Sequence, residues 1–301
     1  MNSLRRQSIG RAAAGEALDL LAEWTPGDRF TSALHPGDVG WFLRFDEQEC
    51  ADAIEVWRFD GMPVAVSLMD DPVLRLAQPV EAQRNSRIAE AMADEITGSR
   101  GDETTAWCDP PIGSALRAEL TRAGWRLDDD PWPHLIFQGS PPDEWPRGAL
   151  LVTEGDAEDR VMVQRQAFDR STFTVQRWRQ MHDSAAADRA VDVLVRTPDG
   201  EPAAAATGWL AGPGRCALLE PVGSRPDLRG QGYGRAAVVA ATMALMRRGA
   251  NAVGVLTPSN NAAALSLYRS AGFRPVAEQH SMMFDVSDGE IPSGPAGQAG
   301  E

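Results

Sequence analysis

Hydrophobic and polar residues alternate along two similar stretches, one in each half of the chain. Ile54–Leu68 (IEVWRFDGMPVAVSL) and Val191–Leu210 (VDVLVRTPDGEPAAAATGWL) each contain a strand pattern, a DGxP turn and a second strand pattern. Asp-Gly between two such runs is typical of a β-hairpin. Each stretch is therefore predicted to form two antiparallel strands, and the turns, at Asp60 and Asp199, lie 139 residues apart.

A helical pattern that ends at glycine also occurs in both halves. ALRAELTRAGWR (Ala115–Arg126) and ALSLYRSAGFR (Ala264–Arg274) each continue into an aromatic residue and an arginine, and their Ala-Gly pairs begin 148 residues apart, at Ala123 and Ala271. The order of hairpin and helix is the same, and a longer loop in the second half would account for the unequal separations. We interpret the chain as a tandem duplication, although both signals are common enough to recur by coincidence.

The second half shows a mixed pattern. Acidic residues near Asp156, and Arg247 and Arg248 before Gly249, are typical of helix ends. We predict a layered α/β fold, with a mixed central sheet flanked by helices, in each of two tandem domains. Besides the hairpin, the expected helices cover residues 156–168, 174–181, 234–248 and 260–273, and the expected strands cover 216–223, 251–258 and 281–286.

A Pro- and Gly-rich stretch, GSPPDEWPRG (139–148), lies near the midpoint and indicates a linker. The last residues, SDGEIPSGPAGQAGE, contain almost no large apolar side chain that could offset the entropy of ordering. We therefore predict a first domain at residues 1–140, a linker at 141–148, a second domain at 149–286 and a disordered tail at 287–301.

The composition and net charge of the chain limit the kinds of partner that it is expected to bind. The chain has 301 residues, 43% of them hydrophobic, and a formal net charge of −14. An acidic chain is a poor partner for nucleic acid or an anionic membrane surface and favours a small cationic substrate. Its three cysteines are widely spaced and form no zinc or disulfide pattern, and no apolar run approaches the roughly 18 residues of a membrane span. We expect a cytoplasmic monomer or homodimer without a metal.

The segment RGQGYGR (Arg229–Arg235) places three glycines at alternate positions before a predicted helix. Such glycines let backbone amides point the same way, and the helix N-terminus adds partial positive charge, so a phosphate or pyrophosphate is the expected ligand. The spacing is not GxGxxG, and no Lys-Ser or Lys-Thr follows as in a P-loop. On its own, the loop is also compatible with a turn that binds nothing.

Two motifs in order give the loop a context. LLEPVGSRPDLRGQGYGRAA followed by NNAAALSLYRSAGF resembles the GCN5-related N-acetyltransferase (GNAT) family, with the patterns [QR]xxGx[GA] and NxxAxxLYxxxGF. The resemblance covers about residues 150–286 and implies the family's fold and acetyl-CoA as acetyl donor. By position, it implies that CoA is bound by Val222, Gly223, Ser224, Arg229, Gly230, Gln231, Gly232, Tyr233, Gly234, Arg235 and Asn261.

The resemblance also implies catalytic roles. Tyr268 would protonate the departing thiolate as general acid, although a tyrosine on a helix can also be a packing residue. Because an alkylammonium is not nucleophilic at neutral pH, a base is needed, and Glu220 is the candidate, directly or through water. Glu220 could equally be a solvated or salt-bridged carboxylate. An amide freed where the strand splays at a bulge would stabilise the thioester oxyanion.

The first half lacks both motifs. The segment that corresponds to the glycine loop, Val80–Ile96, contains no glycine, and Leu120 stands where Tyr268 does. We therefore interpret the N-terminal copy as degenerate, with a role in walling the acceptor site or stabilising the second half, as in tandem members of the family whose C-terminal domain is active.

The function predicted from the sequence is acetyl transfer from acetyl-CoA to a primary amine of a small, cationic metabolite or antibiotic. The alternatives are a non-catalytic acyl-CoA-binding regulator, a peptide or protein N-acetyltransferase, and a duplication that serves assembly alone.

Overall fold

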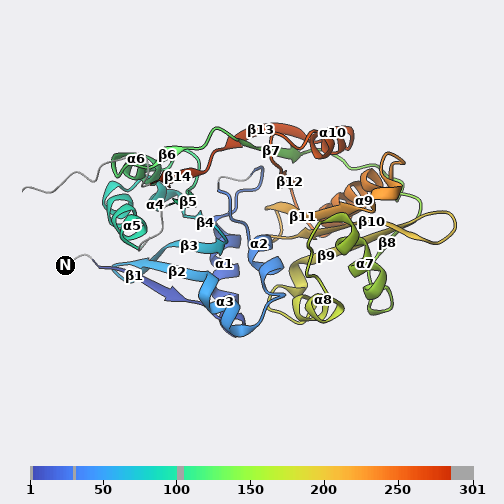
Figure 1. Cartoon of the computed structure of the whole chain (residues 1–301), viewed down its shortest axis with the longest axis horizontal. Helices are drawn as coiled ribbons and strands as arrows, with labels where there is room; N and C mark the ends of the chain where they lie inside the picture. Colours follow the sequence, from blue (N-terminus) through green and yellow to red (C-terminus); the bar gives the residue numbers. More distant parts are fainter. Residues whose placement is uncertain (1–2, 30–31, 100–104, 286–301) are drawn as a thin grey trace, which may run out of the picture.

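The structure is a computed structural model that describes residues 3–29, 32–99 and 105–285. Two seven-stranded mixed sheets lie at opposite ends of an elongated molecule, with helices packed against each (Figure 1). Mixed sheets flanked by helices are the layered α/β architecture expected from the sequence. The tail predicted at residues 287–301 lies outside the described residues.

The first half consists of strands and helices that follow one another in short groups. In chain order they are β1 (Leu4–Ser8), α1 (Gly15–Trp24), α2 (Pro36–Phe42), α3 (Glu47–Ala53), β2 (Ile54–Phe59), β3 (Met62–Asp70), β4 (Val73–Ala77), α4 (Val80–Gln83), α5 (Ser86–Gly98), β5 (Thr105–Asp109), α6 (Ala115–Arg122), β6 (Arg126–Leu127) and β7 (Trp132–Phe137).

The second half repeats this order with two α-helices instead of three between its first two strands, and without an α-helix that corresponds to α4. Its elements are β8 (Ala149–Leu151), α7 (Ala157–Ala167), α8 (Val175–His182), β9 (Ala190–Arg196), β10 (Pro202–Trp209), β11 (Cys216–Ser224), α9 (Tyr233–Arg247), β12 (Ala252–Leu256), α10 (Ala262–Ser270), β13 (Arg274–Gln279) and β14 (Met282–Asp285). Both predicted hairpins form, as β2–β3 and β9–β10.

The two sheets exchange one strand each. Their strand orders are β1-β2-β3-β4-β5-β14-β6 and β8-β9-β10-β11-β12-β7-β13, so the sixth strand of each sheet comes from the other half. The matching orders support the tandem duplication. The division into two domains at residues 141–148 stays a prediction. It separates the halves along the sequence, whereas β7 and β14 each lie in the sheet of the other half.

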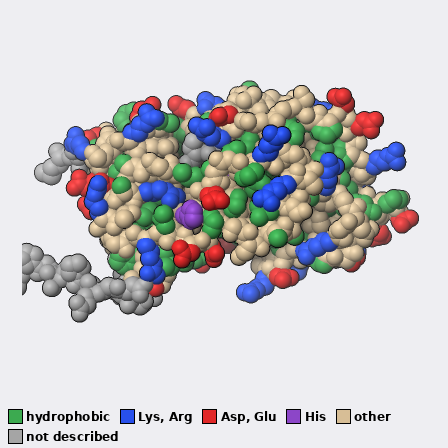
Figure 2. Space-filling view, turned by 90° about the horizontal axis from the view of Figure 1, so that it is seen from above, with side chains coloured by type: hydrophobic (Ala, Val, Ile, Leu, Met, Phe, Trp, Pro, Cys, Tyr) green, Lys and Arg blue, Asp and Glu red, His purple; other side chains and the backbone are tan. Residues whose placement is uncertain are grey.

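A shared core joins the halves. One hydrophobic cluster contains Leu21 and Val39 from the first half together with Met181 and Trp209 from the second, all buried. No helix within the described residues is long and apolar enough to cross a membrane. On the face shown in Figure 2, acidic and basic side chains are interspersed, so the net negative charge is not gathered there into one patch.

Candidate active site

Two adjoining cavities run along β11. The first, of about 380 Å³, lies between the halves and is lined by Asp70, Arg75 and Asp109 from the first half and by Glu220 and Tyr268 from the second; we call it the interdomain cavity. The second, of about 670 Å³, surrounds the glycine loop and is called the glycine-loop cleft. The two share the lining residues Phe168, Val222 and Asn261. A ligand in the cleft can therefore reach the cavity at these residues.

The glycine loop has the conformation that an anion-binding nest requires. Gly230 and Gly232 have φ angles of 77° and 90°, and a Cβ at either would meet nothing within 4 Å. Gly232 is the N-cap of α9, and among the described residues no side chain caps this helix. The backbone amides at the start of α9 therefore face the cleft with no competing side-chain acceptor, which suits a phosphate group.

Most residues predicted to bind CoA line the glycine-loop cleft. Arg229 and Arg235 lie at its edge, where Arg229 donates to the Ala167 carbonyl (3.3 Å) and Arg235 to the Ser270 carbonyl (3.0 Å). Gln231 is exposed and, within the described residues, is not part of the lining. The other predicted residues in the lining are Val222, Gly223, Ser224, Gly230, Gly232, Tyr233, Gly234 and Asn261.

β11 leaves its parallel neighbour where the two cavities meet. It pairs with β12 only at Cys216–Leu218 but continues along β10 to Ser224. The register with β10 shifts between Ala206 and Gly208, so that Glu220 and Pro221 together lie opposite Thr207. The splayed strand and bulge implied by the family resemblance are therefore present in the structure.

Tyr268 lies on α10 beside this opening. Its side chain is 6% exposed, lines the interdomain cavity and packs against Phe273 with ring centroids 5.9 Å apart. Burial, and then the negative charge of Glu220, raise the pKa of the Tyr268 hydroxyl. The hydroxyl therefore stays protonated at neutral pH and has a proton to donate. Asn261 sets the start of this helix by accepting a hydrogen bond from the Ala264 amide (3.1 Å).

Comparisons with known proteins identify the family of the chain. Residues 157–273 match the model of the Acetyltransferase (GNAT) family. A mycothiol acetyltransferase from Clavibacter michiganensis subsp. michiganensis is 30% identical over 232 residues, which cover 72% of this chain and 75% of that protein. The chain belongs to the GNAT acetyltransferase family. Enzymes of this family use acetyl-CoA, and the protein is accordingly an acyltransferase.

Solved structures show the same tandem fold along almost the whole chain. A tandem GNAT protein from the clavulanic acid biosynthesis pathway has a TM-score of 0.60 and 18% identity, with 94% of this chain and 98% of that chain covered. A GNAT-family acetyltransferase from Colwellia psychrerythraea has a TM-score of 0.59 and 13% identity, with 93% and 99% covered. At these identities the likeness concerns the fold.

The first GNAT-like half lacks an anion nest for a physical reason. The Asn85 side chain accepts hydrogen bonds from the Arg87 and Ile88 amides, and so occupies the start of α5, the counterpart of α9. Leu120, at the position of Tyr268, is fully buried in the core of this half. The degenerate copy predicted from the sequence therefore lacks both the free helix terminus and the acid.

The first half nevertheless reaches Glu220. Arg75 on β4 donates to Asp38 (2.7 Å), to Asp70 (3.3 Å) and to the Ala33 carbonyl (2.8 Å), and the Asp38 carboxyl is hydrogen-bonded to Glu220. Burial, and then the charge of Asp38, raise the pKa of Glu220 well above the usual carboxyl range. A carboxylate with a raised pKa is a stronger base, as a general base near neutral pH requires.

Close packing of α2 on the second sheet brings Asp38 to this position. A Cβ on Gly37 or Gly40 would lie 2.5 or 2.6 Å from the Trp209 side chain, so only glycine allows this approach. The Trp209 indole in turn donates to the Glu220 carbonyl (2.7 Å). His35 caps α2 by accepting from the Gly37 amide, and its other ring nitrogen lies 3.0 Å from the Cys216 carbonyl.

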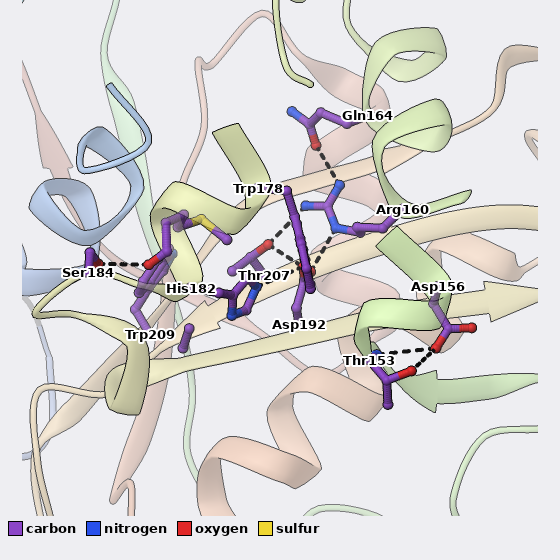
Figure 3. A network of polar contacts seen from close by, with 12 residues as sticks. Thr153, Asp156, Arg160, Gln164, Trp178, His182, Ser184, Asp192, Thr207 and Trp209 are labelled. Atoms are coloured by element: carbon purple, nitrogen blue, oxygen red, sulfur yellow. Dashed lines mark hydrogen bonds and ion pairs between the residues drawn. The ribbon is translucent and has the colours of Figure 1, made fainter. Parts of the chain in front are cut away.

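A buried ionic network supports the opposite side of the bulge (Figure 3). The fully buried Arg160 donates to Asp192 (2.7 Å) and Thr207 (2.9 Å), and the Trp178 indole donates to Asp192 (2.9 Å). Burial opposes ionisation of Asp192, but the positive charge of Arg160 and the hydrogen bonds from His182 and Arg160 together outweigh it and lower the pKa of Asp192 to about 2. Because Thr207 lies opposite the bulge, the network fixes the backbone beside Glu220.

Sequence reasoning missed several residues of the site. Asp38, Asp70, Arg75 and Asp109 are far from the family motifs in sequence, and no local pattern marks them. Among the described residues, no group of three or more His, Cys, Asp or Glu side chains is placed to hold a metal ion.

Proposed function

We propose that the protein transfers the acetyl group of acetyl-CoA to a primary amine of a small cationic metabolite or antibiotic, which binds in the interdomain cavity. The observation that carries this proposal is the position of Glu220 and Tyr268 on the same cavity, next to the glycine-loop cleft. A cavity of about 380 Å³ is within the usual range for a small ligand.

The fit of CoA rests on the glycine loop. The amides from Gly230 to Arg235 would bind the pyrophosphate, Arg229 and Arg235 would flank it, and Val222 to Ser224 would pair with the pantetheine arm. Next to Gly230 and Gly232, the position that a Cβ would occupy is open space, which leaves room for a ligand. When bound, acetyl-CoA supplies a thioester as the acetyl donor.

Glu220 and Tyr268 each carry out one of the two proton transfers that the reaction needs. Glu220 takes a proton from the ammonium of the acceptor, directly or through water, and Tyr268 donates a proton to the leaving sulfur. Pro221 has no amide hydrogen, so Val222 is the first residue after Glu220 whose N–H can stabilise the oxyanion.

Charge favours a cationic acceptor. Three acidic residues, Asp70, Asp109 and Glu220, line the interdomain cavity. Among the described residues its lining contains one basic side chain, that of Arg75, which donates hydrogen bonds to Asp38, Asp70 and the Ala33 carbonyl. An anionic acceptor would therefore meet repulsion without a free guanidinium to bind it. A cavity of about 380 Å³ also suits a metabolite better than a folded protein.

The test is release of CoA thiol from acetyl-CoA in the presence of a panel of primary amines. Because the sequence contains no lysine, acetylation of the protein's own lysine side chains cannot contribute to the signal. We expect amine-dependent release by the wild-type protein. Binding of CoA without amine-dependent release would favour the acyl-CoA-binding regulator instead.

A further inference from the structure

Two buried hydrogen-bond acceptors in the interdomain cavity have no donor among the residues that the structure describes. Asp109 Oδ1 and Gln279 Oε1 are fully buried and make no hydrogen bond within the part of the chain that the structure describes. Both residues line the cavity, and Gln279 is only 1% exposed. Buried polar atoms are normally paired, so these two indicate groups that a ligand supplies.

The neighbouring contacts fix the orientation of the Gln279 amide. Its nitrogen donates to the Pro110 and His280 carbonyls, each at 3.4 Å, which leaves its oxygen unpaired. Because Pro110 directly follows Asp109, the contact of Gln279 with Pro110 places the two acceptors close together. They come from the ends of β5 and β13, next to the exchanged strand β14.

Arg117 holds the backbone around the two acceptors in position. Among its hydrogen bonds to the described residues, none is made to Asp109. Its guanidinium donates to the carbonyls of Pro110 (3.2 Å), Pro111 (3.3 Å) and His280 (2.9 Å). The backbone on both sides of the two acceptors is thereby held in position. Two acceptors that are preorganised in this way can bind a ligand with hydrogen-bond donor groups.

We propose that Asp109 and Gln279 form a second subsite that binds a second ammonium group of the acceptor, so that diamines are better substrates than monoamines. An ammonium has donors alone and carries positive charge, whereas a hydroxyl also brings an acceptor that would find no partner among these groups. This inference rests on the proposed function and specifies its substrate class.

The test compares three amines of equal chain length: pentylamine, 1,5-diaminopentane and 5-aminopentan-1-ol. With the wild-type protein we expect kcat/KM for the diamine to exceed that for the monoamine by about 10- to 100-fold, the range of a charge-assisted hydrogen bond. Asp109→Asn should remove this preference, because it should lower kcat/KM for the diamine by a much larger factor than kcat/KM for pentylamine. Gln279→Leu should reduce the preference by a smaller factor.

A matched control is Asp129→Asn, which removes an exposed carboxylate that is not part of the cavity lining. It should leave the diamine preference unchanged. Equal kcat/KM for monoamine and diamine, or an equal effect of Asp109→Asn on both, would overturn the subsite. A rate for the amino alcohol equal to that for the diamine would overturn the assignment to an ammonium.

Failure of the proposed function gives a different result. If no amine releases thiol, calorimetry on the CoA-bound protein still decides the subsite, because 1,5-diaminopentane should bind about 10-fold or more tightly than pentylamine in wild type but not in Asp109→Asn. Equal binding of the two amines would overturn the inference.

Discussion

Tyr268 combines a buried hydroxyl with a position at the junction of the two cavities. Replacement by phenylalanine keeps the ring packed against Phe273 and removes only the proton donor. We expect Tyr268→Phe to lower kcat by about 10²-fold or more and to leave the Kd of CoA nearly unchanged. Steady-state thiol release together with calorimetric CoA titration measures both. Unchanged turnover would remove Tyr268 from the mechanism.

Asp38 is expected to set the pH at which Glu220 becomes a base. The raised pKa of Glu220 means that activity is lost as pH falls through that pKa, because the protonated carboxyl cannot accept a proton. Asp38→Asn removes a neighbouring negative charge and frees Arg75, and both changes lower the pKa of Glu220.

The acidic limb of the kcat/KM profile should therefore move to lower pH in Asp38→Asn. The same amine is used for both proteins, so its own titration cancels in the comparison. Melting temperature and CoA affinity, measured in parallel, show whether the variant is folded. A folded variant with an unshifted limb would contradict this role of Asp38.

At the scale of single elements, we expect CoA binding to depend most strongly on the absence of side chains in the glycine loop before α9. Gly232→Glu would place a negative charge in the phosphate nest, and we expect loss of measurable CoA binding by calorimetry. The matched control is Gly61→Glu, since Gly61 has a similar φ of 85° and equally open surroundings in the β2–β3 turn. Loss of CoA binding in both variants would point to misfolding rather than to the nest.

The buried ionic network of Arg160 and Asp192 beside the bulge stabilises the fold. Asp192→Asn would leave the fully buried Arg160 without its counter-ion, and we expect a loss of about 3–5 kcal/mol in the free energy of unfolding, measured by urea denaturation. Because the pKa of Asp192 is lowered to about 2, the stability it contributes is present above its ordinary pKa of 3.8 and is lost as pH falls towards 2. Asp227→Asn, in an exposed ion pair, should cause no comparable loss.

Local signals in the sequence predicted most of the elements. The Asp-Gly turns, the glycine loop and the motif around Tyr268 each depend on residues close together in the chain, and the structure places them in the predicted hairpins, loop and helix. The partners of β7 and β14 could not be predicted in this way, because alternation identifies a strand but not the sheet that it joins.

The same limit applies to the site. Asp38 and Glu220 belong to different halves, and their contact depends on the close packing of Gly37 and Gly40 against Trp209. A glycine pair in a helix does not by itself indicate what it will pack against. The acidic lining from the first half was therefore visible only in the folded structure.

At the scale of the whole molecule, the strand exchange makes the halves interdependent. Met282 on β14 is fully buried in the core of the first half. Met282→Ala should lower the free energy of unfolding by about 2–5 kcal/mol, although the residue belongs to the second half by sequence. Hydrogen exchange should show faster exchange in β5 and β6. A change confined to the second sheet would contradict the pairing of β14.

The central claim is that both halves build one acceptor site. Its most direct measurement is amine-dependent thiol release from acetyl-CoA by wild type and by Val73→Trp, in which a residue of the first half that lines the interdomain cavity is enlarged. We predict amine-dependent release by wild type and at least a 10-fold lower rate in Val73→Trp, roughly the cost of overfilling a binding site, with an unchanged Kd for CoA. Equal rates in the two proteins, or no amine-dependent release by wild type, would contradict the account.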